Sequence, residues 1–361
     1  MKLLNKKFLY IGIFATAFCA IFSLLEIDRE ASITLIIFSF LIAVFYKYLF
    51  IWNFDWPKGK NNHIYLMIIF LFLFTFISQN VYLNFETLDW DIPSYLVASQ
   101  EISNGNLPNE MQWESKGPLL FYFYHIFLLI SSKNFVVFKL LNDLIIFFLA
   151  VILFLSVYET TGKDYVKSFF SSLFFLLLIS QSWAVSEYSE LFCLLFLAIG
   201  NYLVLKIEIK SSNLFLLGLI LACSTLINQG TFLFVLPFII FFYRKIDFVD
   251  FFKSLLIFGF GLLTPHLIFI FLYAAQNLLE IYFATYIQIP LGYIQSNYAN
   301  LYELRVFLRS FHESLEPLYF AIIAVILFIS VRVFKSFKSL KNLVLDIKYL
   351  NLFICLLFYF V

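Results

Sequence analysis

The sequence predicts an all-α membrane protein that crosses the bilayer about 11 times, with two further helices at the membrane surface. Of the 361 residues, 63% are hydrophobic and only 13% are charged. Soluble domains carry about 45–50% apolar and about 25% charged residues. The apolar runs are nearly continuous and about 20 residues long, which suits a helix that spans a bilayer. They lack the alternation of a transmembrane β-strand.

The predicted crossings follow the apolar runs in chain order. They cover residues 8–25, 32–52, 63–83, 135–158, 165–185, 190–207, 213–228, 231–243, 251–275, 317–331 and 349–361. The first two runs predict an additional N-terminal transmembrane hairpin over residues 1–62, before a main transmembrane region over 63–361. The sequence stops inside an apolar run, so we leave open a truncation at the C-terminus.

Residues 118–130 are the apolar run that we do not expect to cross. As a helix this run is about 20 Å long, short of the roughly 30 Å hydrocarbon core. With the N-terminus in the cytoplasm and this run at the outer interface, most of the 24 basic residues fall in cytoplasmic loops, as the positive-inside rule requires. The two long connections, 84–134 and 276–316, then face outward, and long loops often carry function.

Charge and cysteine content exclude several classes of protein. The net charge of +1 offers no basic surface for nucleic acid. The four cysteines, Cys19, Cys193, Cys223 and Cys355, all lie in apolar runs, where cysteine behaves as a small hydrophobe. Their spacing fits neither a zinc site nor a disulfide framework.

Residues 89–125 are polar and rich in turns, unlike the rest of the chain. The spacing of apolar and polar residues over 94–104 predicts an amphipathic surface helix, with Tyr95 on its membrane face and Ser99 toward water. Gly105 ends this helix, and Pro118 opens the next one. Asp91 and Lys116 would then each precede a surface helix.

The layout resembles the GT-C membrane glycosyltransferases, in particular bacterial relatives of protein O-mannosyltransferases and of the aminoarabinose transferases that modify lipid A. Their first outer loop runs D-E-x-x-Y-x-x-x-A-x-x-I-x-x-G-x-x-P, followed by D/E-x-K-P-P-L. Here "DIPSYLVASQEISNGNLP" keeps the spacing from Asp91 to Gly105, and "ESKGPLLFYF" matches the second part. Ile92 replaces the second acid, and Gly117 replaces the first proline.

The resemblance extends over residues 63–275, and residues 276–316 match only as a long outer loop. Lys139 stands where an arginine is common in the family's next crossing. The segment "SEYSELFCLLFLAIGNYL" resembles one with an outward-facing acid at a helix start. Asn228 takes the place of a family lysine.

The resemblance implies transfer of a sugar from a polyprenyl-phosphate donor to a lipid, glycan or protein acceptor, at the outer face of the plasma membrane. It implies that Asp91 is the general base. The developing charge on the leaving phosphate calls for cations; the candidates are Lys116, Arg305 and Arg309. Secondary candidates are Glu190, Glu187, Glu114, Lys139 and His312. The sequence names no cofactor and leaves a divalent metal open.

Each candidate also has a structural explanation. An acid in an outer loop is commonly a solvated charge, Lys116 can extend beside a surface helix, and Glu190 suits any helix N-terminus. Lys139 can pair with Asp143, four residues later on one helix. Two other functions stay open: a polysaccharide polymerase, and a flippase or transporter of lipid-linked sugars.

Overall fold

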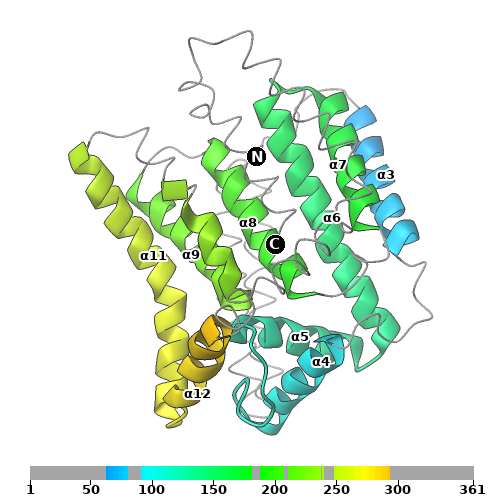
Figure 1. Cartoon of the computed structure of the whole chain (residues 1–361). Coiled ribbons are helices and arrows are strands. Elements are labelled where there is room, and N and C mark those ends of the chain that lie inside the picture. Colours follow the sequence, from blue (N-terminus) through cyan, green and yellow to red (C-terminus); the bar gives the residue numbers. More distant parts are fainter. Residues whose placement is uncertain are drawn as a thin grey trace, which may run out of the picture. The chain divides into compact units, whose positions relative to one another are not determined.

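The computed structural model describes residues 62–79, 91–180, 188–206, 210–236, 238–239 and 248–292. Within these ranges every regular element is a helix, and no strand is present, so the predicted all-α class is confirmed for this part of the chain (Figure 1). The predicted N-terminal hairpin, the crossings after residue 292 and the later part of the second outer loop lie outside the described residues.

The chain divides into two compact units. The first comprises residues 1–114 and 118–192, and the second comprises 115–117 and 193–361. The boundary falls within one helix, α8 (Ser189–Lys206), whose first residues belong to the first unit. Each unit is described by itself.

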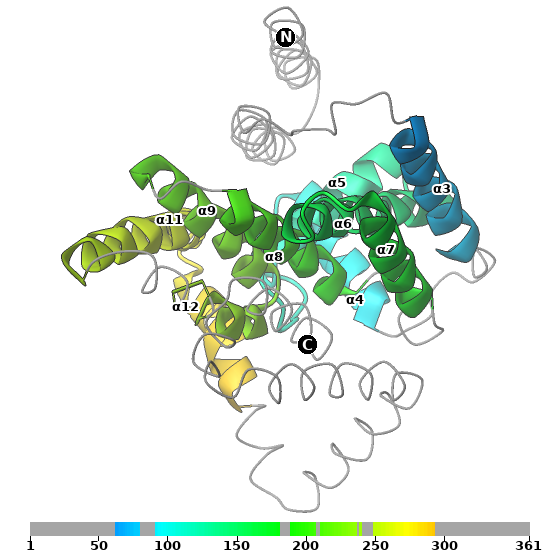
Figure 2. The same cartoon turned by 90° about the horizontal axis from the view of Figure 1, so that it is seen from above.

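Three helices of the first unit lie side by side: α3 (Asn62–Gln79), α6 (Phe135–Thr160) and α7 (Tyr165–Ile179) (Figures 1 and 2). Aromatic rings join them, because Phe72 meets Phe147 edge-on at 5.2 Å between centroids and Phe70 meets Phe169 at 5.6 Å. Edge-on pairs of this kind add to the gain from apolar burial.

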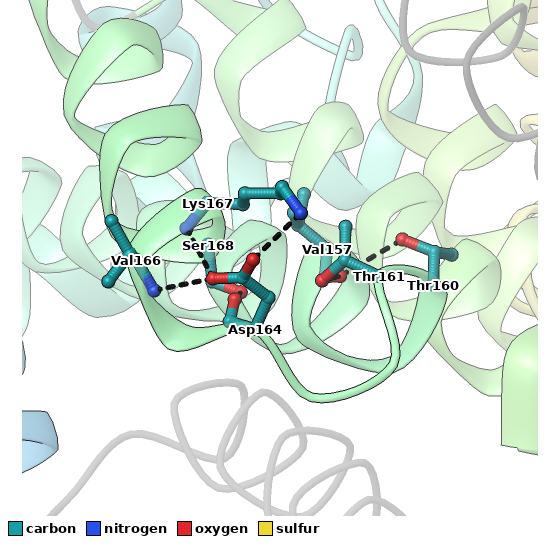
Figure 3. A network of polar contacts seen from close by, with 7 residues as sticks. All are labelled: Val157, Thr160, Thr161, Asp164, Val166, Lys167 and Ser168. Atoms are coloured by element: carbon teal, nitrogen blue, oxygen red, sulfur yellow. Dashed lines mark hydrogen bonds and ion pairs between the residues drawn. The ribbon is translucent and has the colours of Figure 1, made fainter.

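The turn between α6 and α7 is short and capped by polar side chains (Figure 3). The carboxylate of Asp164 accepts hydrogen bonds from the backbone N–H groups of Val166 and Lys167. The Lys167 ammonium lies 2.8 Å from the same carboxylate and is the main reason that the pKa of Asp164 falls below its usual value. Thr161 donates its hydroxyl to the Val157 carbonyl and closes the end of α6.

The polar stretch of the first unit forms α4 (Asp91–Glu101), a 3₁₀ turn η2 (Ile102–Asn104) and α5 (Pro118–Ser131). Gly105 ends the first helix with φ of 99°, and Pro118 opens the next, both as predicted. The prediction for Ser99 was wrong. It is fully buried and donates its hydroxyl to the Tyr95 carbonyl at 2.6 Å, because α4 packs this side against α5.

The helix α5 is short, as predicted, but it is not an amphipathic helix with one open face. Residues 118–128 are all buried, and only Leu129 and Ile130 near its end are exposed. Its rings pack on two other helices: Tyr124 contacts Phe138 of α6 at 5.2 Å, and Phe127 contacts Phe192 of α8 at 5.8 Å. Protein therefore surrounds this helix around most of its circumference.

The second unit contains α9 (Ser211–Ile227), the 3₁₀ turn η3 (Gln229–Phe234), α11 (Phe248–Ala275), α12 (Leu279–Phe283) and the π-turn η4 (Ala284–Gln288). Glycines bring α9 and α11 into backbone contact. A Cβ on Gly218 would lie 2.2 Å from the Phe258 carbonyl oxygen, and one on Gly261 would lie 2.1 Å from that of Phe215. Small residues permit this close approach between membrane helices.

A buried polar contact also ties these two helices. The Thr225 hydroxyl lies 2.9 Å from Nε2 of His266, and the Tyr286 hydroxyl donates to the Thr225 carbonyl at 2.6 Å. The His266 ring stacks on Phe232 at 5.8 Å between centroids. These contacts give His266 a packing role.

Three described helices are long and apolar enough to cross a membrane: Phe135–Thr160, Ser189–Lys206 and Asp250–Ala275. The last of these exposes a stripe of large apolar side chains along its length: Phe252, Leu256, Phe260, Leu263, Leu267 and Phe271. Such a stripe suits contact with lipid. The described residues thus support a helical membrane protein, while the count of about 11 crossings stays a prediction.

Candidate functional site

A cluster of carboxylates forms around the start of α4 in the first unit. Asp91 is the first residue of α4, where the helix dipole favours a negative charge. Tyr95 follows one turn later and is 1% exposed. Its hydroxyl donates to Oδ2 of Asp91 at 3.5 Å. The ring contacts Phe121 and Tyr124 of α5 edge-on, so the aromatic packing fixes where this hydroxyl lies.

Glu114 reaches the same helix from the loop after η2. The Ser94 hydroxyl lies 2.7 Å from Oε2 of Glu114 and 2.8 Å from the Asp91 carbonyl oxygen. One serine therefore contacts both the backbone of Asp91 and the side chain of Glu114. The loop "LPNEMQWESKG", which the sequence predicts between the two helices, is confirmed as a series of turns.

Glu190 comes from the first turn of α8. The Ser189 hydroxyl donates to Oε2 of Glu190 at 3.0 Å, and Ser189 also hydrogen-bonds the Tyr95 side chain. Because Ser189 contacts both residues, Glu190 belongs to the surroundings of Tyr95, although it lies far along the chain from α4.

The charges of the three acids all affect the phenol of Tyr95. Burial is the main cause that raises its pKa above the ordinary value, and the charges of Asp91, Glu190 and Glu114 each raise it further. All three carboxylates thus act on one phenol, which stays protonated and can donate a hydrogen bond. Asp91, Glu114 and Glu190, predicted separately, lie together.

Lys116 belongs to the second unit, on the three-residue segment 115–117. Its side chain is half-buried. The backbone on both sides of it is hydrogen-bonded, through Gly117 to Ile227 at the end of α9 and through Ser115 to the side chain of Gln229 at the start of η3. The structure therefore fixes the position of its backbone within that unit.

Lys139 is buried near the start of α6, at 7% exposure. Its ammonium lies 4.9 Å from the centroid of the Phe135 ring, a cation–π contact. Two polar neighbours, Asn142 and Asp143, are buried on the same helix, and Asn142 donates to the Phe138 carbonyl at 3.0 Å. These contacts give Lys139 a role in packing.

Arg305, Arg309, His312 and Glu187 lie outside the described residues. Among the residues that the structure does describe, no three His, Cys, Asp or Glu side chains are placed to hold a metal ion together.

Sequence reasoning missed two residues of this region. Tyr95 was assigned to a membrane face, although its spacing of four residues from Asp91 could have placed it beside the acid. His125, a lone polar residue within the apolar α5, is 1% exposed. Its Nδ1 lies 3.1 Å from the Ser99 carbonyl oxygen, and burial lowers the pKa of the imidazole.

Comparisons with known proteins add no relative. No model of a protein family matches the chain, and neither the curated proteins nor the solved structures contain a match.

Proposed function

We propose that the chain is a multi-pass membrane glycosyltransferase of the GT-C type, which moves a sugar from a polyprenyl-phosphate donor to a lipid, glycan or protein acceptor. The proposal rests on one observation above all, the gathering of Asp91, Glu114 and Glu190 around the Tyr95 hydroxyl. These are acids that the resemblance singles out, and in sequence they are spread over residues 91–190.

The proposed chemistry needs a base for the acceptor hydroxyl. A carboxylate within hydrogen-bond reach of the acceptor hydroxyl can take its proton as the sugar is transferred. Asp91 takes this role in the proposal, with Glu114 and Glu190 as the neighbouring charges. Lys116, Arg305 and Arg309 are the proposed contacts to the donor phosphate, whose charge grows as the sugar leaves.

The dimensions of α6 support an arrangement across the membrane. Its 26 residues extend about 39 Å. Near its first turns, Phe138 packs against α5, while Asp164 and Lys167 follow its other end. The proposal places α4 and α5 on the outer side of the plasma membrane, the α6–α7 turn in the cytoplasm, and about 11 crossings in the whole chain.

The test is sugar transfer from a polyprenyl-phosphate sugar in membranes that are matched for protein level. Asp91→Asn keeps the size of the side chain and removes its basicity. We expect a loss of roughly 100- to 10,000-fold in rate, the usual contribution of a general base. Transfer near the wild-type rate would exclude the role of Asp91.

Two matched controls use the same substitution. Asp164→Asn changes a helix cap that asparagine also satisfies, and Asp89→Asn changes the acid two residues before Asp91. Both variants should transfer sugar at close to the wild-type rate. A larger defect in Asp89→Asn than in Asp91→Asn would mean that the base is the other acid of the pair.

A flippase of lipid-linked sugars is the second candidate, favoured by the burial of Lys139 and Asp143 within a helix long enough to cross the membrane. Ionisable residues inside such helices often serve transport. Movement of the donor across vesicle bilayers, without any sugar transfer, would support this candidate over the enzyme.

A further inference from the structure

The segment that carries Lys116 is hydrogen-bonded at one end to the last residue of α9 and at the other end to the first residue of η3. The backbone N–H of Gly117 donates to the Ile227 carbonyl at 3.0 Å. The Gln229 side chain donates through Nε2 to the Ser115 carbonyl at 2.6 Å. These two hydrogen bonds lie on either side of Lys116, and we call the arrangement the 115–117 clasp.

The clasp has no room for a side chain at position 117. A Cβ on Gly117 would lie 1.9 Å from the Leu226 carbonyl oxygen and 2.4 Å from its carbon. Backbone atoms cannot move aside as the tip of a flexible side chain can. The segment therefore lies directly against the last turn of α9, and its distance from that helix is set by backbone contact.

The part of the second unit that holds Gln229 is itself fixed by side-chain hydrogen bonds. Asn228 accepts from the Gly230 N–H at 3.0 Å. The Thr231 hydroxyl donates to the Asn228 carbonyl at 2.7 Å, and the Ser224 hydroxyl donates to Thr231 at 2.9 Å. Gln229 thus extends from a turn that is tied back to α9.

Only the nitrogen of the Gln229 side-chain amide has a hydrogen-bond partner among the described residues. Its Nε2 bonds Ser115, while Oε1 is buried with no hydrogen-bond partner among the described residues. A buried acceptor without a partner is unfavourable, and an apolar side chain of similar size would avoid it. What an apolar side chain could not supply is a hydrogen-bond donor to the Ser115 carbonyl, and the Gln229 amide supplies it.

The geometry points to Gln229 as a positioning residue that fixes the backbone of Lys116. A lysine ammonium moves on a flexible four-carbon side chain. Fixing the backbone of Lys116 therefore reduces the volume that its charge can occupy. Pre-placed charge stabilises a developing anion better than charge that must first be ordered. The identification of that anion as the donor's phosphate rests on the proposed function.

Gln229→Met tests this role, because methionine keeps the length of the side chain and removes the N–H group that donates to the Ser115 carbonyl. Gln276→Met, the same substitution at an exposed position, is the matched control. Hydrogen exchange at the Gly117 amide reports the clasp directly and needs no reaction. We expect exchange there to rise about 10-fold in Gln229→Met, because the hydrogen bond from the Gly117 N–H to the Ile227 carbonyl opens more often, and to stay unchanged in Gln276→Met.

The functional effect is measured by titrating wild type and variants with polyprenyl phosphate in vesicles and by the kinetics of transfer. Gln229→Met should raise the donor KM about 5- to 10-fold with kcat within about twofold, since it loosens a contact without removing a reacting group. Combined with Lys116→Ala, it should add nothing to the effect of Lys116→Ala alone, because residues that act through one another are not additive.

Two results would overturn the inference: unchanged polyprenyl phosphate binding in Gln229→Met despite faster exchange at Gly117, or a full additional loss in the double variant. Failure of the proposed function looks different, because wild type itself would then transfer no sugar. In that case the binding titration still tests whether Gln229 positions Lys116 for a phosphate.

Discussion

Glu114 and Lys116 are two residues apart in the chain, but different kinds of contact hold them. Glu114 meets α4 through a side-chain hydroxyl, that of Ser94. The residues on either side of Lys116 are held through their backbone atoms, and a glycine lies against a carbonyl group. The position of Glu114 thus depends on a side-chain hydrogen bond, whereas the position of Lys116 depends on close packing of the backbone around it.

This difference predicts which substitutions each region tolerates. Around Tyr95, a change that keeps the ring and removes one polar atom should alter activity more than folding. In the 115–117 clasp, one additional methyl group should disturb the fold of the second unit, although it changes no charge.

Gly117→Ala should destabilise the second unit most. The new methyl group would overlap the Leu226 carbonyl, so the segment must move away from α9 and lose the hydrogen bond to Ile227. Overpacking together with a lost backbone hydrogen bond should cost about 3 kcal/mol. Thermal unfolding in detergent measures the loss.

Gly230→Ala is the matched control, since a Cβ there would meet only Oδ1 of Asn228, at 3.2 Å. It should leave the melting temperature nearly unchanged. Equal stability of Gly117→Ala and Gly230→Ala would contradict the argument that backbone space governs the clasp.

Tyr95→Phe should lower activity with little loss of stability. Phenylalanine keeps the ring contacts with Phe121 and Tyr124 and removes the hydroxyl that donates to Asp91. A hydrogen bond to a charged group contributes about 1.5–3 kcal/mol, and the long 3.5 Å contact favours the lower end, about 10-fold in rate. Transfer assays and thermal unfolding, run in parallel, separate the two effects.

The pH dependence supplies a sharper measurement for the same variant. A carboxylate that loses a hydrogen-bond donor keeps its proton to higher pH. The acidic limb of the pH–rate profile should therefore move upward in Tyr95→Phe. A uniform loss of rate at every pH would indicate that the hydroxyl only supports the packing.

Local signals in the sequence were sufficient for much of the fold. Apolar runs located the helices, and Gly105 and Pro118 marked where α4 ends and α5 begins. Asp91, Glu114 and Glu190 were singled out through short motifs that resemble those of the GT-C family, and each motif is local in the chain. Their meeting at Tyr95 was not predictable, since it depends on how α8 packs against α4 and α5.

The error at Ser99 and the burial of α5 have one cause. Hydropathy reports that a segment avoids water, but it does not distinguish a lipid neighbour from a protein neighbour. Both α5 and α11 are strongly apolar, yet α5 is buried in protein while α11 exposes Phe252, Leu256 and Phe260. In the sequence the two helices differ in length, at 14 and 28 residues, whereas which of their faces protein covers depends on the tertiary structure.

The glycine contacts between α9 and α11 have a mechanical consequence in a bilayer. As helices, their 17 and 28 residues extend about 26 Å and 42 Å, and a helix longer than the hydrocarbon core is accommodated by tilting. Because Gly218 and Gly261 lock the two backbones together, tilt of α11 is transmitted to α9.

The last turn of α9 contacts the 115–117 clasp. We therefore expect a change in the tilt of α11 relative to the membrane to shift the backbone of Lys116. Bilayer thickness then acts as an effector, without any binding site of its own. In vesicles whose acyl chains range from about 14 to about 20 carbons, the donor KM should follow thickness by about twofold, since mismatch costs only fractions of a kcal/mol per Å. A change in bilayer thickness would then alter the position of the Lys116 ammonium, although nothing binds to the protein.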